Sequence, residues 1–273
     1  CGRSPATGLW TESHCGGFWG TELRKAGYDG LWITGKAQEP AYLWIHDDQI
    51  EVRDAAHLWG METATAQATL IQALGSKPKP RVAVIGPAGE SQIPFALILA
   101  DHGRVAGRTG MGAVMGSKNL KAVAVCGSSK IPIVAQNFPE LRSAANRDLK
   151  DDNFTSAAHE LGTAAVADYA DYLGEMPKKY FQAGTFDGVA KVSGSTMAET
   201  ILTGTSACHA CVIACGRVVA LPETFGVLVT SSKFLEMPDK DPKGLPREQK
   251  GPEYETIVGF GPNLLIDDLP FIV

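Results

Sequence analysis

The stretch Gly110-Met111-Gly112-Ala113-Val114-Met115-Gly116-Ser117-Lys118-Asn119-Leu120-Lys121 leads directly into the apolar run Ala122-Val123-Ala124-Val125-Cys126. The chain has 30 glycines in 273 residues, and many of them gather here and in the residues just upstream. Glycine at this density beside apolar segments indicates tight turns and close approach of the backbone to a bulky ligand. The residues Lys121–Cys126 predict a strand that follows the glycine-rich segment.

Four cations accompany these glycines, namely Arg104, Arg108, Lys118 and Lys121. Bare backbone amides together with cations suit a phosphorylated cofactor. The triplet Gly116-Ser117-Lys118 is similar to the end of a phosphate-binding loop, but the upstream glycine spacing of a Walker motif is absent. A glycine-rich turn within a β-rich domain is the plain alternative.

Short strands and helices are predicted on the N-terminal side of this stretch. Ala41–Ile45 and Ile50–Arg53 flank a turn at Asp47-Asp48 and predict a hairpin. Three further elements are predicted along the chain: a helix over Thr63–Leu74, a strand over Arg81–Gly86 and a helix over Glu90–Ala100. Residues 1–130 are therefore expected to form a β-rich N-terminal domain.

The pattern changes beyond a predicted linker at Ser128–Val134. Phe138–Lys150 and Thr155–Gly174 carry apolar positions at three- and four-residue spacing, which predicts helices. Residues 135–273 are expected to form a mainly helical second domain, with the polar stretch Met237–Gln249 as a surface loop. The predicted fold class is α+β, a β-rich base domain followed by a helical one.

Composition narrows the class of protein. The net charge of −5 argues against a general nucleic-acid binder, and the apolar runs are too short to span a membrane. No secretory or lipidation signal is visible, and six cysteines, three of them clustered, are not a secreted disulfide framework. The cytoplasm is the expected compartment. The chain stops inside the apolar run Leu264–Val273, so its second domain is expected to be incomplete.

The clustered cysteines lie in Cys208-His209-Ala210-Cys211-Val212-Ile213-Ala214-Cys215, a C-x2-C-x3-C spacing. This spacing lets three thiolates converge on one soft metal centre, as iron–sulfur clusters require. A [4Fe–4S] cluster normally takes four cysteine ligands, and this run supplies three. A structural zinc site and unmetallated thiols are the alternatives.

Two further segments carry chemistry-bearing residues. Ser13–Gly20 contains a glycine pair before a short predicted helix, which could place amides against an anion or form a tight turn. Gly251–Thr256 contains Glu253 and Glu255, which would share one face of a strand but diverge on a helix. Buried carboxylates with raised pKa values could transfer protons, whereas an exposed helix start would explain both acids equally well.

In this order, these segments resemble the tungsten-containing aldehyde ferredoxin oxidoreductase family, and the resemblance runs through nearly the whole chain. The cysteine triplet and Gly251–Thr256 correspond to the family's second domain. The motifs similar to its N-terminal domain are Ser4-Pro5-Ala6-Thr7-Gly8, Gly16-Gly17-Phe18-Trp19-Gly20, Ala26-Gly27-Tyr28-Asp29, Gly35-Lys36-Ala37, Asp54-Ala55-Ala56-His57-Leu58-Trp59-Gly60, Ile85-Gly86-Pro87-Ala88-Gly89-Glu90 and Gly110–Lys121.

The resemblance implies a tungsten (or molybdenum) bis-molybdopterin and a [4Fe–4S] cluster. It implies oxidation of a small aldehyde to the carboxylic acid with water, the electrons passing through the cluster to ferredoxin or another electron-transfer subunit. Cys208, Cys211 and Cys215 would hold the cluster, and Glu253 or Glu255 would move protons near tungsten. The residues that would contact the pterins are His14, Cys15, Gly16, Gly17, Arg104, Val105, Gly107, Arg108, Gly110 and Gly112.

The chain also departs from the family pattern. His14-Cys15 stands where Asn-Ser is more usual. The family's third domain is absent, and with it a fourth cluster cysteine, a second pterin-binding segment and a catalytic histidine, so a truncated form is expected. Two alternatives stay open: a relative in the same superfamily that acts on an acyl-CoA or a sugar aldehyde, and a cluster-only electron-transfer or scaffold subunit. A homodimer and a hetero-oligomer are both compatible with the sequence.

Overall fold

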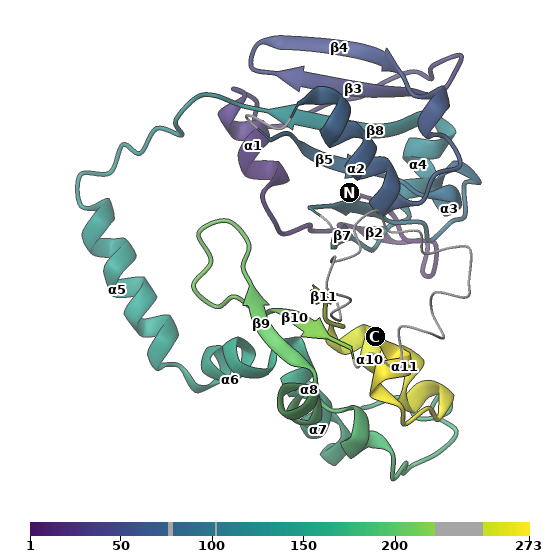
Figure 1. The fold of residues 1–273 in the computed structure, drawn as a ribbon, viewed down its shortest axis with the longest axis vertical. Coiled ribbons are helices and arrows are strands. Elements are labelled where there is room, and N and C mark those ends of the chain that lie inside the picture. Colours follow the sequence, from purple (N-terminus) through teal and green to yellow (C-terminus); the bar gives the residue numbers. More distant parts are fainter. Residues whose placement is uncertain (76–78, 102, 222–247) are drawn as a thin grey trace, which may run out of the picture. The chain divides into compact units, whose positions relative to one another are not determined.

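The structure is a computed structural model that describes residues 1–75, 79–101, 103–221 and 248–273. The chain forms two compact units, Cys1–Val134 and Ala135–Val273, each built around its own sheet (Figure 1). The described residues contain no helix with the length and apolar character needed to cross a bilayer.

Unit 1 is built on a six-stranded mixed sheet with the order β4-β3-β8-β5-β6-β7. Its strands are β3 (Ala41–His46), β4 (Gln49–Asp54), β5 (Arg81–Val84), β6 (Ile98–Ala100), β7 (Arg104–Ala106) and β8 (Leu120–Cys126). β3 runs parallel to β8, and the other neighbours are antiparallel. The predicted hairpin is confirmed as β3 and β4, which pair from Ala41 with Asp54 to His46 with Gln49. A separate two-stranded ribbon joins β1 (Gly2–Arg3) to β2 (Trp10–Thr11).

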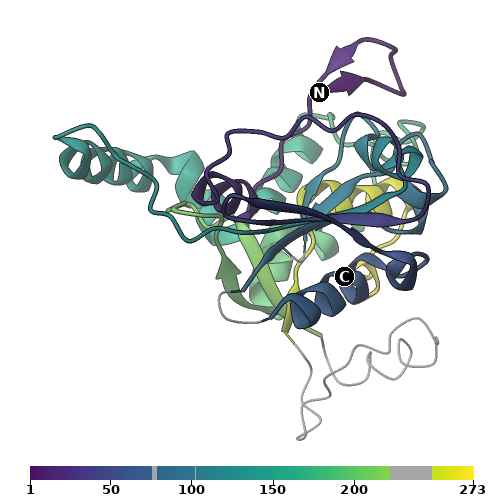
Figure 2. The same cartoon turned by 90° about the horizontal axis from the view of Figure 1, so that it is seen from above.

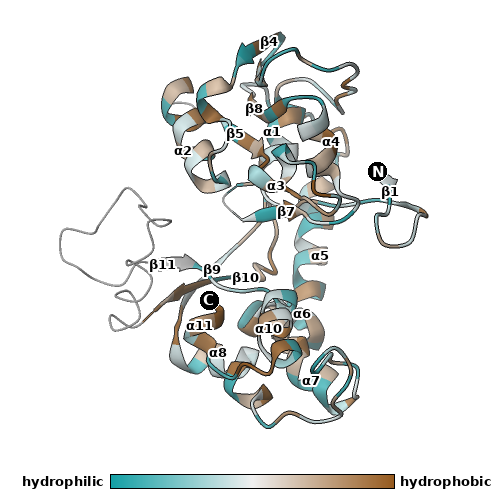
Figure 3. Cartoon of the chain, turned by 90° about the vertical axis from the view of Figure 1, so that its right-hand side faces the viewer, coloured by the Kyte–Doolittle hydropathy of each residue, from teal (hydrophilic) through white to brown (hydrophobic). Residues whose placement is uncertain are grey.

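Strand β8 is the centre of unit 1, because all its residues are buried and its side chains alternate between two cores. Ala122 and Ala124 pack with α2 (Thr63–Leu74) and η1 (Ala56–Leu58) on one face. Val123 and Val125 pack on the other face, together with side chains of α1 (Trp19–Lys25) and α4 (Met111–Ser117). Figure 2 shows α2 and α4 on opposite sides of the sheet. Figure 3 shows apolar residues along β5 and β8 inside the unit and hydrophilic ones along β4 at its edge.

The predictions for β5, β8 and α2 are confirmed, but the helix predicted over Glu90–Ala100 is wrong. The segment contains the end of a short helix, α3 (Pro87–Glu90), then a turn with Gln92 at φ 56°, then strand β6. Pro94 interrupts any helix through this segment, since proline lacks the amide hydrogen and its ring clashes with the preceding turn. The short apolar run at Ile98 instead pairs with β5 and β7.

Unit 2 begins with α5 (Phe138–Asp151), which confirms the helix predicted there. The long helix predicted over Thr155–Gly174 is interrupted at Gly162, where φ is 72°. The segments are α6 (Asn153–Leu161), η2 (Thr163–Ala165) and α7 (Val166–Tyr172). The elements that follow are η3 (Val189–Val192), α8 (Gly194–Thr200), α10 (Tyr254–Phe260), η4 (Pro262–Leu264) and α11 (Leu269–Ile272).

Unit 2 also contains an antiparallel sheet that the sequence did not predict, with the order β11-β10-β9. Its strands are β9 (Leu202–Ser206), β10 (Gly216–Ala220) and β11 (Glu248–Lys250). Val219 of β10 packs in one core with Met197 of α8 and Ile257 of α10. Residues 237–247 of the predicted surface loop lie outside the described residues, and Glu248 and Gln249 belong to β11.

Candidate functional site

The three clustered cysteines lie in the connection between β9 and β10, and each is half-buried. The amide of Cys211 donates a hydrogen bond of 3.2 Å to the carbonyl of Cys208. Ala210 and Ala214, each directly before a cysteine, have φ values of 54° and 51°. Left-handed backbone is unfavourable for alanine, so the surrounding structure must hold this loop in place.

Arg217, in strand β10, forms most of the hydrogen bonds that keep the cysteine loop in place. Its side chain is 2% exposed and, within the described part of the chain, donates to main-chain carbonyls. On the loop side, Nη2 donates to Ala214 at 2.8 Å and Nε donates to Cys215 at 3.3 Å. On the other side, Nη1 and Nη2 donate at 2.7 and 2.9 Å to Glu160 and His159, near the end of α6. Helix ends leave such carbonyls without intrahelical partners, so Arg217 joins the cysteine loop to α6.

Two further residues complete this attachment. Gly162 has φ 72°, and a Cβ atom at this position would lie 2.9 Å from the Cys215 carbonyl and 3.0 Å from Arg217 Nε. Only glycine permits both the backbone conformation and the close approach. The Nδ1 atom of His159 lies 2.6 Å from the carbonyl oxygen of Ile213, in the middle of the loop.

The donor set of the loop fits an iron–sulfur cluster, although its thiols are not gathered. Among the described residues, no group of three or more His, Cys, Asp and Glu side chains is arranged to hold a metal ion. All six cysteines lie in the described part of the chain, and none forms a disulfide. Three thiols in one short loop match three of the four ligands of a [4Fe–4S] cluster, so Cys208, Cys211 and Cys215 could bind one after local movement. Cys126 is buried in β8, and burial raises the pKa of its thiol, as expected of a structural cysteine.

The two candidate carboxylates have different surroundings, because the segment forms a helix. α10 begins at Tyr254, immediately after Glu253, and Glu255 is exposed in its first turn. The hydroxyl of Thr163 donates to Glu253 Oε2 at 2.6 Å and accepts the amide of Tyr254 at 2.9 Å. The amide of Gly251 donates to the carbonyl of Arg217 at 3.0 Å. Glu253 therefore belongs to the network behind the cysteine loop, and Glu255 faces solvent.

In unit 1, the structure brings together two segments predicted to contact pterin. The amide of Arg108 donates to Ser13 Oγ at 3.0 Å. At Gly17, where φ is 93°, an added Cβ would lie 3.1 Å from Arg104 Cγ. His14, Cys15 and Gly16 are exposed between these contacts, as are Val105 and Gly107 beyond Arg104. The predicted cofactor-binding residues of both segments thus lie on neighbouring turns.

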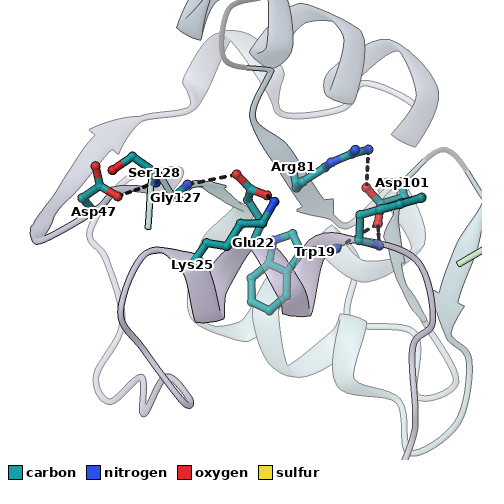
Figure 4. Close-up of polar contacts among 9 residues, drawn as sticks. Trp19, Glu22, Lys25, Asp47, Arg81, Asp101, Gly127 and Ser128 are labelled. Atoms are coloured by element: carbon teal, nitrogen blue, oxygen red, sulfur yellow. Dashed lines mark hydrogen bonds and ion pairs between the residues drawn. The ribbon is translucent and has the colours of Figure 1, made fainter. Parts of the chain in front are cut away.

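Asp101, which the sequence analysis missed, anchors this pair of turns. Its Oδ2 accepts the amides of Phe18 and Trp19 at the start of α1, at 2.5 and 3.0 Å, and its Oδ1 lies 3.4 Å from Arg81 Nη1 (Figure 4). The guanidinium carbon of Arg81 lies 4.5 Å from the centroid of the Phe18 ring. Of the two alternatives for this segment, a bound anion would not use the amides of Phe18 and Trp19, because a carboxylate of the protein itself accepts both.

Part of the glycine-rich stretch is explained by packing alone. Cβ atoms at Gly110, Gly112 and Gly116 would lie 1.9, 2.4 and 1.8 Å from carbonyl oxygens of the segment that includes α3 and precedes β6. α4 needs these glycines in order to approach that segment. At Gly107, in contrast, a Cβ would lie 3.6 Å from a side-chain carbon of Val105, an ordinary contact. Gly107 has no comparable packing reason.

Two of the four cations near this stretch serve the fold. Lys121 is 0% exposed, pairs with Glu90 and donates to the carbonyl of Met61 at 2.9 Å. Lys118 donates to the carbonyl of Gly35 at 3.0 Å. Arg104 is half-buried and Arg108 exposed, so the cations on the turn next to Ser13 are the better candidates for binding phosphate.

Comparisons with known proteins agree with this two-unit arrangement. Residues 1–127 match the family model for the N-terminal domain of aldehyde ferredoxin oxidoreductase, and residues 140–273 match the model for its domains 2 and 3. A tungsten-containing aldehyde ferredoxin oxidoreductase of Pyrococcus furiosus is 41% identical over 273 residues, which covers 99% of this chain and 41% of the relative. The chain therefore spans less than half the length of that relative.

Two further proteins are similar as well, one of them over less than half of this chain. The WOR-like subunit of an aliphatic sulfonate oxidoreductase of Pyrococcus furiosus is 44% identical over 126 residues, 42% of this chain and 20% of that protein. A solved structure of the active-site complex BamBC of benzoyl coenzyme A reductase with 1,5-dienoyl-CoA superposes with a TM-score of 0.68 at 25% identity. The match covers 99% of this chain and 39% of the solved one.

The two units are matched, in chain order, by the N-terminal and C-terminal domain models of one class of oxidoreductase. The chain belongs to the aldehyde ferredoxin oxidoreductase family.

Proposed function

We propose that this chain supplies the pterin-binding base and part of the cluster-binding domain of an oxidoreductase that converts an aldehyde to a carboxylic acid. The observation that carries the proposal is the consecutive match of both units to one family, with the cysteine triplet set in a held loop of the second. The bound groups would be a tungsten (or molybdenum) bis-molybdopterin and a [4Fe–4S] cluster. Together they would accept two electrons from the substrate and release them one at a time.

The residues of the chain have separable tasks in this proposal. In unit 1, the exposed turns at His14–Gly17 and Arg104–Arg108 bind the pterins, with the two arginines facing phosphate and Gly107 leaving room for the ligand. Gly110 and Gly112 act indirectly, because they let α4 pack closely against the segment that precedes β6. In unit 2, Cys208, Cys211 and Cys215 hold the cluster.

Glu253 is the better of the two candidates for proton transfer. Thr163 fixes the orientation of its carboxylate through Oε2, so the group is held in one place for accepting a proton during water attack on the aldehyde. Glu255, exposed in the first turn of α10, interacts favourably with the positive end of the helix and needs no further role.

Metal analysis of the anaerobically purified full-length protein tests the proposal. About one tungsten or molybdenum and about four irons per chain are expected for the enzyme. Iron without tungsten or molybdenum would favour a cluster-only electron-transfer subunit, and zinc alone would contradict both functions. Reduction of ferredoxin by the purified protein in the presence of an aldehyde tests the expected partner. Recovery of this activity in the cytoplasmic fraction of a cell extract tests the expected compartment.

A second substrate class is supported by one observation, the likeness of almost the whole chain to the BamBC complex, whose solved structure contains a dienoyl-CoA. In this second proposal, the enzyme uses the same pterin and cluster sites to act on a CoA thioester instead of a free aldehyde. Turnover of a panel of aldehydes against a panel of acyl-CoA compounds, with ferredoxin as electron carrier, separates the two.

A further inference from the structure

The charge of Arg217 is unusual for a buried arginine. Among the described residues, its side chain donates four hydrogen bonds, all to main-chain carbonyls, and forms no ion pair with a carboxylate. Burial lowers the pKa of Arg217, while the nearby charges of Cys215 and Glu253 raise it. Arginine stays protonated in proteins, so a full positive charge is fixed beside the cysteine loop.

The surroundings of Arg217 explain how the chain tolerates this charge. The carbonyls of His159 and Glu160 lie at the C-terminal end of α6, where the helix dipole favours a cation. The carbonyls of Ala214 and Cys215 bring the loop to the same guanidinium. In this poorly solvated position, the charge acts on the cysteines with little screening by water.

We propose that Arg217 is a positioning residue for the cysteine loop and that its positive charge raises the reduction potential of the cluster held by Cys208, Cys211 and Cys215. The inference rests on the proposed function, since it requires a cluster in this loop. Reduction of the cluster adds one electron, passed from the site of aldehyde oxidation and later given to ferredoxin. A fixed cation beside the loop stabilises the more negative, reduced state, and net charge and hydrogen bonding are known to set cluster potentials.

The test compares Arg217→Lys, which keeps the charge, with Arg217→Gln, which removes it, in the anaerobically purified full-length protein. Iron per chain and the midpoint potential of the cluster, from a redox titration followed by electron paramagnetic resonance, are measured for each. Arg217→Gln is expected to lower the equilibrium constant for cluster reduction about tenfold, a shift of about 59 mV to more negative potential for one electron. Arg217→Lys is expected to retain iron and the wild-type potential.

Lys178→Gln is the control for loss of a buried cation in unit 2: Lys178 is also 2% exposed and donates to the carbonyl of Gly184, but, unlike Arg217, it pairs with a carboxylate, that of Asp171. It should lower stability without moving the potential. An unchanged potential in Arg217→Gln would overturn the inference, and so would a fall of the same size in Arg217→Lys. If the Arg217→Gln variant loses its iron, the Arg217→Lys variant is the deciding test. A cluster retained at the wild-type potential in Arg217→Lys supports the role of the charge, and loss of iron from Arg217→Lys as well refutes that role.

The same measurements separate this inference from the proposed function. A wild-type protein without iron would remove the cluster itself and therefore the proposed function. If the wild-type protein has a normal cluster and the Arg217→Gln variant has the same cluster potential, the result refutes only the role of Arg217 and leaves the proposed function in place.

Discussion

Glu253 and Glu255 are two residues apart and chemically identical, yet the structure gives them different surroundings. Glu253 precedes α10 and accepts a hydrogen bond from Thr163, while Glu255 lies exposed in the first helical turn. The sequence left open whether the segment was a strand or a helix, and only a strand would have placed both acids on one face. Catalytic roles can therefore be assigned to the two acids separately.

We expect Glu253→Gln to lower turnover by about 10²-fold or more, the usual contribution of a positioned proton-transfer group. Glutamine keeps an oxygen that can accept the Thr163 hydroxyl, so the iron and tungsten contents should not change. Glu255→Gln is the matched control and should keep wild-type turnover. Steady-state aldehyde oxidation and metal analysis are measured for both variants. Wild-type turnover in both would show that neither carboxylate transfers protons and that the segment is purely structural.

The elements of the chain show which features a single sequence reveals and which it hides. Helices α2 and α5 and the β3–β4 hairpin follow from local periodicity, and their predicted bounds agree closely with the structure. The helix predicted from Glu90 fails because an apolar run of this length is equally compatible with a buried strand, which long-range pairing with β5 selects.

The candidate site was hidden for a similar reason. The cysteines were evident from their spacing, but Arg217, Thr163 and Asp101 become visible only when distant segments are brought together. One signal was available in the sequence: Arg217 is a lone charge within the otherwise uncharged strand Gly216–Ala220. A buried charge of this kind requires partners, so its position predicts a hydrogen-bonding network.

Gly162 connects two elements of unit 2, and its substitution tests the attachment of the cysteine loop. Its φ of 72° and ψ of −163° lie in a region that only glycine adopts readily, at a cost of about 1–3 kcal/mol for other residues. An added Cβ would also press on the Cys215 carbonyl. Gly162→Ala is therefore expected to lower the free energy of unfolding by at least that amount and to reduce the iron content.

Gly174→Ala is a suitable control for this substitution. Gly174 has the same φ of 72°, but nothing lies within 4 Å of an added Cβ. Its loss of stability should be smaller, and its iron content should equal that of the wild type. Denaturant unfolding and iron analysis compare the two variants, and equal iron in both would show that the loop does not depend on Gly162.

At the scale of the whole molecule, the proposed pterin site and the proposed cluster site lie in different units. The turns proposed to bind pterin lie in Cys1–Val134, and the cysteine loop lies in Ala135–Val273. Each unit has its own sheet and its own buried cores. A substitution at the surface of one site should therefore leave the fold of the other unit intact.

This separation predicts that the two cofactors can be lost independently. Cys211→Ala should abolish the broad visible absorption of the cluster and most of the iron, with tungsten retained, because Cys211 is a proposed ligand of the cluster alone. Arg108→Ala should lower the tungsten and pterin contents and leave the cluster spectrum unchanged; its side chain is exposed, and the contact with Ser13 uses only the Arg108 amide. Metal analysis and visible spectra of the full-length variants measure both effects. Unchanged absorption in Cys211→Ala would refute the ligand assignment, and unchanged tungsten in Arg108→Ala would remove Arg108 from the pterin site.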